Sequence, residues 1–239
     1  MKIETVTFLS DGLQLKGFLH VPDAGNPVAV VFGSHGLFSD GNSPKQCDMA
    51  QCCGEAGIAY FRFSHRGCGD SQGTASDAID FAGRVRDLET AIETILPQIG
   101  PSLPMGLYGS SLGGAVCLAV AQKRQSAAIV TYAAPVRSTG EGELPSPNAI
   151  PEHILRHPAF GFDLRNHLSA VHHALVVHGS DDPVVPVSHA NDIFNGISGP
   201  KKLIIQNGGD HPMSLPQHQE QFRKDALAWF RKYLIGDRR

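Results

Sequence analysis

The sequence carries little net charge, few cysteines and no long apolar run. Its 239 residues hold 20 Lys and Arg against 23 Asp and Glu, with the two signs interspersed. It therefore lacks the basic stripe of a nucleic-acid-binding protein. No stretch approaches the roughly 18 apolar residues of a membrane span, and the first residues show no signal segment. We expect a cytoplasmic protein without a membrane span or a nucleic-acid partner.

The scarcity of cysteine excludes a disulfide-stapled fold. The chain has five cysteines, an odd number, and none of them is spaced like a pair of metal ligands, so reduced thiols are expected. The adjacent Cys52 and Cys53 lie on an expected helix, where burial as small apolar residues is the default. Cys68 lies in a glycine-rich loop, and both its exposure and a functional role for it are left open.

Histidine is plentiful, with twelve residues, but no cluster of His and carboxylates has the spacing of a metal site. His172 and His173 are adjacent and point in different directions in an extended chain. We therefore expect neither a metal nor an organic cofactor.

Apolar runs alternate with stretches of helical periodicity along most of the chain. The residues up to 21 predict a hairpin of two strands, turning at Ser10-Asp11-Gly12. The alternation that follows is typical of a parallel sheet. It predicts strands at 28–32, 59–63, 105–108, 127–133, 174–178 and 202–206, and helices at 45–55, 77–96, 111–125, 187–197 and around 222–233.

These elements predict one α/β domain over residues 1–239, with a mostly parallel sheet of about eight strands and helices on both faces. The alternation pauses after the sixth strand. Residues 135–168 form a short, cap-like insertion, and loops of this length are often functional. The hairpin is an expected sheet edge, and the oligomeric state is left open.

A serine lies between two glycines where the strand 105–108 meets the next helix, in Gly109-Ser110-Ser111-Leu112-Gly113. A tight strand-to-helix turn needs small residues two before and two after its serine, and Gly109 and Gly113 supply them. The helix directs free N–H groups toward the serine, and the N–H of Leu112 is placed to bind an oxyanion. The pattern predicts Ser111 as a nucleophile.

Two other serines compete with Ser111. Ser71 lies in a second match, Gly69-Asp70-Ser71-Gln72-Gly73, but that match is separated from its strand and no apolar helix follows it. Ser110 has no glycine two residues before it and none two residues after it. The context therefore favours Ser111.

A serine nucleophile needs a base, and the base works best when a carboxylate orients it. Downstream, Asp181 and Asp182 follow one predicted strand and His211 follows the next. The carboxyl ends of the strands in an α/β sheet are where ligands bind. The order Ser, Asp, His is that of the α/β-hydrolase triad.

These motifs resemble the α/β-hydrolase superfamily, specifically its small serine hydrolases of the esterase, lysophospholipase and serine-aminopeptidase type. The resemblance covers nearly the whole chain and implies the α/β-hydrolase fold. Ser34-His35-Gly36-Leu37 matches the family's oxyanion loop, which implies that the N–H groups of Leu37 and Leu112 form the oxyanion hole and that His35 organises this loop. The family pattern His-Gly-x-x-Asp-x-x-Val-Pro selects Asp182 over Asp181, and Gly-x-x-His selects His211.

The resemblance also accounts for the second serine motif. Residues 66–73 match the family loop Arg-Gly-x-Gly-x-Ser-x-Gly, so Ser71 is a loop residue. Ser64 stands two before Arg66, where relatives usually have Asp, so the ion pair of that Asp is not expected.

The resemblance implies a serine hydrolase that cleaves carboxylic esters of small to medium size through an acyl-serine, with Ser111, His211 and Asp182 as catalytic residues. A peptidase or amidase, or a thioesterase, with the same triad are the alternatives. A non-catalytic, ligand-binding homologue is a further class, but such proteins usually lose a triad member and this chain keeps all three.

Overall fold

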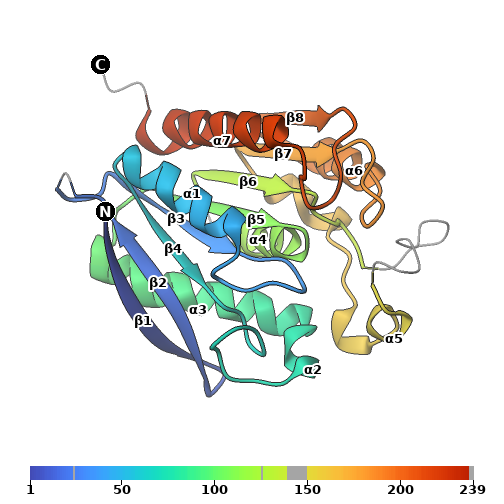
Figure 1. Cartoon of the computed structure of the whole chain (residues 1–239), viewed down its shortest axis with the longest axis horizontal. Helices are drawn as coiled ribbons and strands as arrows, with labels where there is room; N and C mark the ends of the chain where they lie inside the picture. The colour runs from blue at the N-terminus through green and yellow to red at the C-terminus, as the bar shows by residue number, and fades with distance from the viewer. Residues whose placement is uncertain (24, 125, 139–149, 237–239) are drawn as a thin grey trace.

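A twisted sheet forms the middle layer of the molecule (Figure 1). The computed structural model describes residues 1–23, 25–124, 126–138 and 150–236. Within them the sheet has eight strands in the order β1-β2-β4-β3-β5-β6-β7-β8. The first two pairings, β1 with β2 and β2 with β4, are antiparallel, and all others are parallel. The predicted fold class is confirmed. The strands are β1 (Lys2–Ser10), β2 (Leu13–Val21), β3 (Ala29–Ser34), β4 (Ile58–Phe63), β5 (Met105–Ser110), β6 (Ala128–Tyr132), β7 (Ala174–Gly179) and β8 (Lys201–Gln206).

The hairpin at one edge of the sheet follows from its turn residues. Asp11 and Gly12 adopt positive φ values of 48° and 81°, and Ser10 pairs with Leu13 across them. A two-residue turn with two positive φ angles matches the natural twist of an antiparallel pair. The hairpin places β1 at the sheet edge, beside β2.

The central strands are apolar on both faces because helices cover both sides of the sheet. Successive residues of β5 show the alternation: Leu107 belongs to the core on one face and Tyr108 to the core on the other. The first core includes residues of α3 and α4, and the second includes residues of α1 and α7. The helices that flank the sheet are α1 (Pro44–Glu55), α3 (Phe81–Ile99), α4 (Leu112–Lys123), α6 (Ser188–Gly196) and α7 (Pro216–Phe230).

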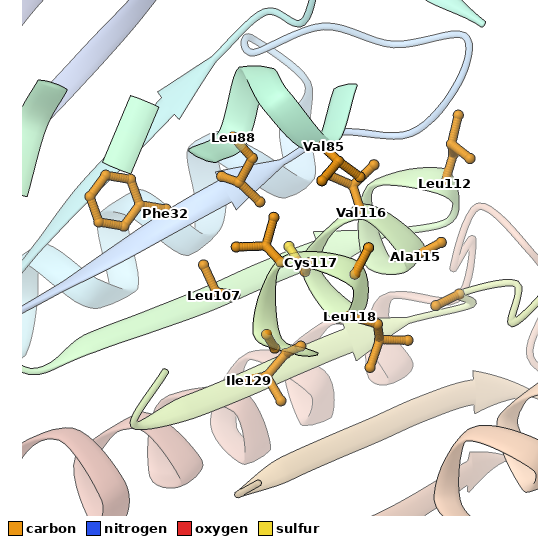
Figure 2. Close-up of a cluster of buried hydrophobic side chains, with 14 of the residues drawn as sticks. Phe32, Val85, Leu88, Leu107, Leu112, Ala115, Val116, Cys117, Leu118 and Ile129 are labelled. Carbon is orange, nitrogen blue, oxygen red and sulfur yellow. The ribbon is translucent and has the colours of Figure 1, made fainter. Parts of the chain in front are cut away.

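The core between the sheet and helices α3 and α4 lies directly beneath the serine turn. Figure 2 shows Phe32 and Leu107 of the sheet facing Leu88 of α3 and Val116 and Cys117 of α4. All five side chains have no measurable exposure. Burying an aliphatic or aromatic side chain stabilises a fold by about 1.5–3 kcal/mol. This packing fixes α4, whose first residue follows Ser111.

The predicted helix over 77–96 is wrong at its start. The structure has a short helix α2 (Ala75–Ala78) and begins α3 only at Phe81. Thr74 and Asp77 form a reciprocal capping box that starts α2 early. Asp80 then adopts an extended conformation, with ψ at 100°. The chain therefore turns between the two helices.

The described part of the predicted insertion packs on the main body. It contains α5 (Glu152–Leu155) and two 3-10 turns, Pro158–Phe160 and Arg165–Ala170. The Phe162 ring stacks on Phe81 of α3, with 4.0 Å between ring centroids. Residues 139–149 of the predicted insertion lie outside the described residues. In the part of the chain that is described, no helix is long and apolar enough to cross a membrane.

Candidate active site

Ser111 occupies a strained turn between β5 and α4. Its φ of 53° and ψ of −129° lie in a region that L-residues rarely adopt. Two backbone hydrogen bonds hold it there: the Ser111 N–H donates to Tyr132 O, and the Gly114 N–H donates to Ser111 O, both at 2.8 Å. Ser111 thus connects the last residue of β5, Ser110, to the first residue of α4, Leu112.

The two flanking glycines are required by close backbone approaches. A Cβ on Gly109 would collide with the carbonyl of Gly113, and a Cβ on Gly113 would collide with the backbone of Ser34. The need for small residues two before and two after the serine, which the sequence indicated, therefore has a direct steric cause. The turn is wedged between its own helix and the end of β3.

Ser111, His211 and Asp182 lie in one line of hydrogen bonds. The His211 Nε2 lies 3.0 Å from Ser111 Oγ, and its Nδ1 lies 2.7 Å from Asp182 Oδ2. Since a carboxylate only accepts, the imidazole proton is on Nδ1 and Nε2 is free to accept from the serine hydroxyl. A base in this tautomer can take the proton of the serine as it attacks.

Asp182 is held as an anion by four groups, of which His211 is one. Its Oδ1 accepts from the N–H groups of Val184 and Val185, both at 2.8 Å, and its Oδ2 lies 3.4 Å from His178 Nε2. Burial alone would raise the pKa of Asp182, but hydrogen bonds from His178, His211 and the Val185 backbone outweigh it and hold the pKa below its usual value. His178 is a contributor that the sequence reasoning did not single out.

The neighbouring Asp181 points away from this line. It is exposed, and its carboxylate accepts a hydrogen bond of 2.6 Å from Ser180 Oγ. Its N–H donates to Gly209 O, which ties the Asp182 loop to the segment that leads to His211. The geometry thus brings Asp182, and not Asp181, to the histidine.

The loop that carries His211 is anchored at the preceding residue. Asp210 O accepts from the Tyr132 hydroxyl at 2.6 Å, and Asp210 Oδ1 accepts from the Ser214 N–H at 2.7 Å. Tyr132 also holds Ser111 through its carbonyl. One residue of β6 therefore fixes the spacing between the serine turn and the histidine loop.

The loop after β3 lies against Ser111. A Cβ on Gly36 would stand 3.4 Å from Ser111 Cβ, so the backbone of residues 35–37 passes directly beside the serine. Among the described residues, the N–H groups of Leu37 and Leu112 have no hydrogen-bond acceptor. Two free N–H groups that flank a serine can bind a negatively charged oxygen.

Arg84 of α3 fixes the carbonyl side of that loop. Its guanidinium is fully buried and donates to the carbonyls of His35, Gly36 and Leu37 at 3.2 to 3.4 Å, while its Nε donates to Ala78 O at 2.7 Å. With the carbonyls turned toward Arg84, the N–H groups of the loop are free to face the other way. The sequence reasoning missed this residue.

His35 and His65 form a second buried support. His35 Nδ1–H donates to Gly36 O at 2.8 Å, and His35 Nε2 accepts from the His65 N–H at 3.0 Å. His65 Nε2 in turn accepts from Ser34 Oγ at 2.8 Å, and His65 Nδ1 lies 3.4 Å from Asp87 Oδ2. Burial, and then the charge of Arg84, lower the pKa of His35 well below its usual value; burial lowers the pKa of His65 to about 4. His35 thus holds the loop as a neutral imidazole.

The remaining sequence candidates have structural positions. Ser71 Oγ donates to Ser64 O at 2.6 Å and accepts from the Lys16 N–H at 3.0 Å, which ties its loop to β2. Although Ser64 replaces the family's Asp, Arg66 pairs with the buried Asp87 at 2.7 Å.

Cys68, whose exposure the sequence left open, is buried. Its Sγ accepts from Arg84 at 3.3 Å, and burial raises the pKa of its thiol. The glycine-rich loop folds inward over α3, which removes Cys68 from solvent. Within the described residues no group of three or more His, Cys, Asp or Glu side chains could hold a metal ion.

Two cavities meet at Ser111. The larger, about 590 Å³, includes Gly36, Lys45, Tyr108 and His211 in its walls. The smaller, about 40 Å³, is lined mainly by apolar side chains, among them Phe160 and Phe162 of the insertion. Both open on the serine, so a bound molecule can extend in two directions from it.

The sequence is similar to those of known proteins. The family described as serine aminopeptidase, S33, matches residues 25–157. YfhR of Escherichia coli K12, described as an uncharacterized protein, is 28% identical over 222 residues, which cover 87% of this chain and 73% of YfhR. Monoglyceride lipase of Rattus norvegicus is 32% identical over 101 residues, 42% of this chain and 32% of the lipase.

Solved structures show the same fold. The α/β hydrolase GrgF from Penicillium sp. sh18 superposes with a TM-score of 0.85 at 19% identity, covering 98% of this chain and 100% of GrgF. Est1E from Butyrivibrio proteoclasticus, solved with ferulic acid bound, superposes with a TM-score of 0.81 at 16% identity, covering 96% and 99%. At these identities the likeness is one of fold.

The neutral histidines predict a loss of stability in weak acid. His35 and His65 exclude protons that they bind at about pH 6.5 once unfolded, so the unfolded state gains protons as pH falls. The contribution of His65 is complete above about pH 6.5 and is lost between there and about pH 4, while the contribution of His35 falls from the same pH downward. Each histidine adds a slope of up to about 1.4 kcal/mol per pH unit.

Urea unfolding at several pH values between 7 and 5 measures this slope. We expect a smaller slope in His35→Gln than in the parent protein, whatever its absolute stability. The exposed His167 supplies the control, and His167→Gln should keep the parent slope. Equal slopes in His35→Gln and the parent would contradict the neutral state of His35.

Proposed function

The chain belongs to the serine aminopeptidase S33 family of the α/β-hydrolase superfamily, and from that membership we propose that it hydrolyses carboxylic esters through an acyl-serine intermediate. Membership and fold make it an enzyme of the hydrolase class. The observation that carries the proposal is the line of hydrogen bonds from Ser111 through His211 to Asp182, beside two backbone N–H groups that have no acceptor among the described residues.

In the proposed first half-reaction, Ser111 Oγ attacks the ester carbonyl carbon while His211 Nε2 takes the hydroxyl proton. Asp182 keeps the imidazole in the reactive tautomer and stabilises the imidazolium. His211 then gives the proton to the alcohol oxygen as the C–O bond breaks, leaving the acyl group on Ser111. In the second half, His211 activates a water that attacks the acyl-serine and releases the acid.

The N–H groups of Leu37 and Leu112 stabilise the oxyanion of both tetrahedral intermediates in this proposal. Because they are backbone groups, a substitution of either leucine does not remove them. Arg84 and His35 set the orientation of the loop that carries the Leu37 N–H. They are positioning residues and do not touch the substrate.

Peptide hydrolysis is the second candidate because the family is named for an aminopeptidase. An aminopeptidase needs a carboxylate to bind the α-ammonium group of its substrate. In the larger cavity Asp48 already faces Arg223 at 3.5 Å, while Lys45 contributes a positive charge. The positive charge of Lys45 repels an ammonium group, so the cavity favours an ester substrate over a peptide with a free amino terminus. A thioesterase would use the same residues.

Removing the nucleophile is the first test. We expect Ser111→Ala to lose at least about 10³-fold in kcat/KM on p-nitrophenyl acetate and butyrate, because no acyl-serine can form. Ser71→Ala is the matched control from the other serine motif and should keep activity within a few-fold. Loss of activity in Ser71→Ala with retention in Ser111→Ala would overturn the proposed site.

The choice of carboxylate is tested by a pair of neighbouring substitutions. Asp182→Asn should lower kcat by about 10³- to 10⁴-fold, because an amide favours the wrong imidazole tautomer. Asp181→Asn, which changes an exposed side chain, should remain within about twofold. Initial rates on p-nitrophenyl acetate measure both, and a larger loss in Asp181→Asn would reject Asp182 as the orienting group.

A further inference from the structure

Lys45 contributes a positive charge to the wall of the larger cavity. It is the second residue of α1, and its side chain is partly buried. Its ammonium has no hydrogen-bond or ion-pair partner among the described residues, and lies 5.6 Å from the centroid of the Tyr132 ring. The other cation in the cavity wall, Arg223, faces Asp48 at 3.5 Å.

The carboxylates that attract Lys45 are already engaged. Burial lowers the pKa of Lys45, and the charges of Asp210 and Asp182 oppose this change. Asp182 is bonded to His211, and Asp210 Oδ1 accepts from the Ser214 N–H. A partly buried cation without a direct partner is costly for the fold, and an anion that enters the cavity would supply the partner.

A second unpartnered polar group lines the same cavity. Tyr108 is fully buried, and its hydroxyl has no hydrogen-bond partner in the described structure. The nearby Tyr132 hydroxyl, in contrast, is bonded to Asp210 O. A phenolic O–H can donate to a carboxylate. The cavity therefore offers one ammonium and one hydroxyl donor that the protein leaves unused.

The position of His211 indicates which end of the substrate meets these groups. The protonated imidazole must reach the leaving alcohol oxygen, so the alcohol portion lies on the His211 side of Ser111. His211 lines the larger cavity, whereas the described walls of the smaller one include Leu37, Ser111 and Leu112 without it. The alcohol portion thus extends toward Lys45, and a short acyl group fits the smaller, apolar cavity.

We propose that the larger cavity selects esters whose alcohol portion carries a carboxylate, which pairs with Lys45 and accepts a hydrogen bond from Tyr108. The inference rests on the proposed ester hydrolysis and adds a substrate class to it. Water adds across the ester bond, and the products are a short carboxylic acid and a hydroxy acid.

The test compares two acetate esters of nearly equal shape, 4-acetoxybenzoate and its neutral amide, 4-acetoxybenzamide. We expect the parent enzyme to prefer the carboxylate by about ten- to a hundredfold in kcat/KM at pH 7, the range of one charge-assisted contact. The preference should shrink as salt rises from 0.05 to 0.5 M. No preference in the parent enzyme would overturn the proposal.

Variants assign the preference to its residues. The ratio of kcat/KM for 4-acetoxybenzoate to kcat/KM for 4-acetoxybenzamide should fall close to one in Lys45→Met, which should still hydrolyse 4-acetoxybenzamide. In Tyr108→Phe the same ratio should fall severalfold. Lys123, which is exposed and pairs with Glu89, provides the charge-matched control, and Lys123→Met should keep the parent ratio. An undiminished ratio in Lys45→Met would contradict the assignment.

A binding experiment separates this proposal from the proposed function. Calorimetry with Ser111→Ala should show 4-acetoxybenzoate binding at least tenfold more tightly than 4-acetoxybenzamide, and the added Lys45→Met should abolish the difference. If neither ester is hydrolysed by the parent enzyme but this difference appears, ester hydrolysis fails and the anion site stands. Equal binding of both compounds overturns the anion site whatever the activity.

Discussion

The strained conformation of Ser111 is the constraint on which the site depends. A residue with φ at 53° between a strand and a helix persists only where its surroundings over-determine it. Here β5 fixes the chain before the serine, α4 fixes the chain after it, and the Tyr132 carbonyl holds its N–H. The cores on both faces of the sheet help to fix the turn, because Leu107 packs in one core and Tyr108 in the other.

The polar side chains that support this turn, Arg84 and His35, are buried. Their shape matters as much as their charge. Arg84 donates to loop carbonyls and to Cys68 Sγ, and among the described residues no carboxylate pairs with it. His35 is useful only while neutral, since its Nε2 accepts a backbone N–H. Such groups cost desolvation energy, and the fold retains them because they orient the N–H groups beside the serine. The site therefore draws on stability supplied by the apolar cores.

The sequence predicted the sheet well because buried parallel strands are short, continuous apolar runs with clear boundaries. It also predicted Ser111, Asp182 and His211, which the structure brings into contact; their catalytic roles stay a prediction. The break between α2 and α3 was missed because the helical periodicity of Val85, Leu88, Ile92 and Ile95 does not mark where the helix begins. Arg84 was missed for a different reason: an arginine on an amphipathic helix is usually solvated, and its carbonyl partners lie 47 to 49 residues away in the chain. Lys45, at the start of a helix, is unremarkable until the cavity beside it is known.

In the proposed reaction Ser111 becomes covalently attached to the acyl group, and a mechanism-based phosphonate detects this attachment at the serine itself. Intact-protein mass spectrometry after treatment with a fluorophosphonate should show one adduct, and peptide mapping should place it on Ser111. Reaction should slow severely in Asp182→Asn, because the base is no longer oriented. An adduct on another residue, or no adduct in a protein that still hydrolyses esters, would contradict the role of Ser111 as the nucleophile.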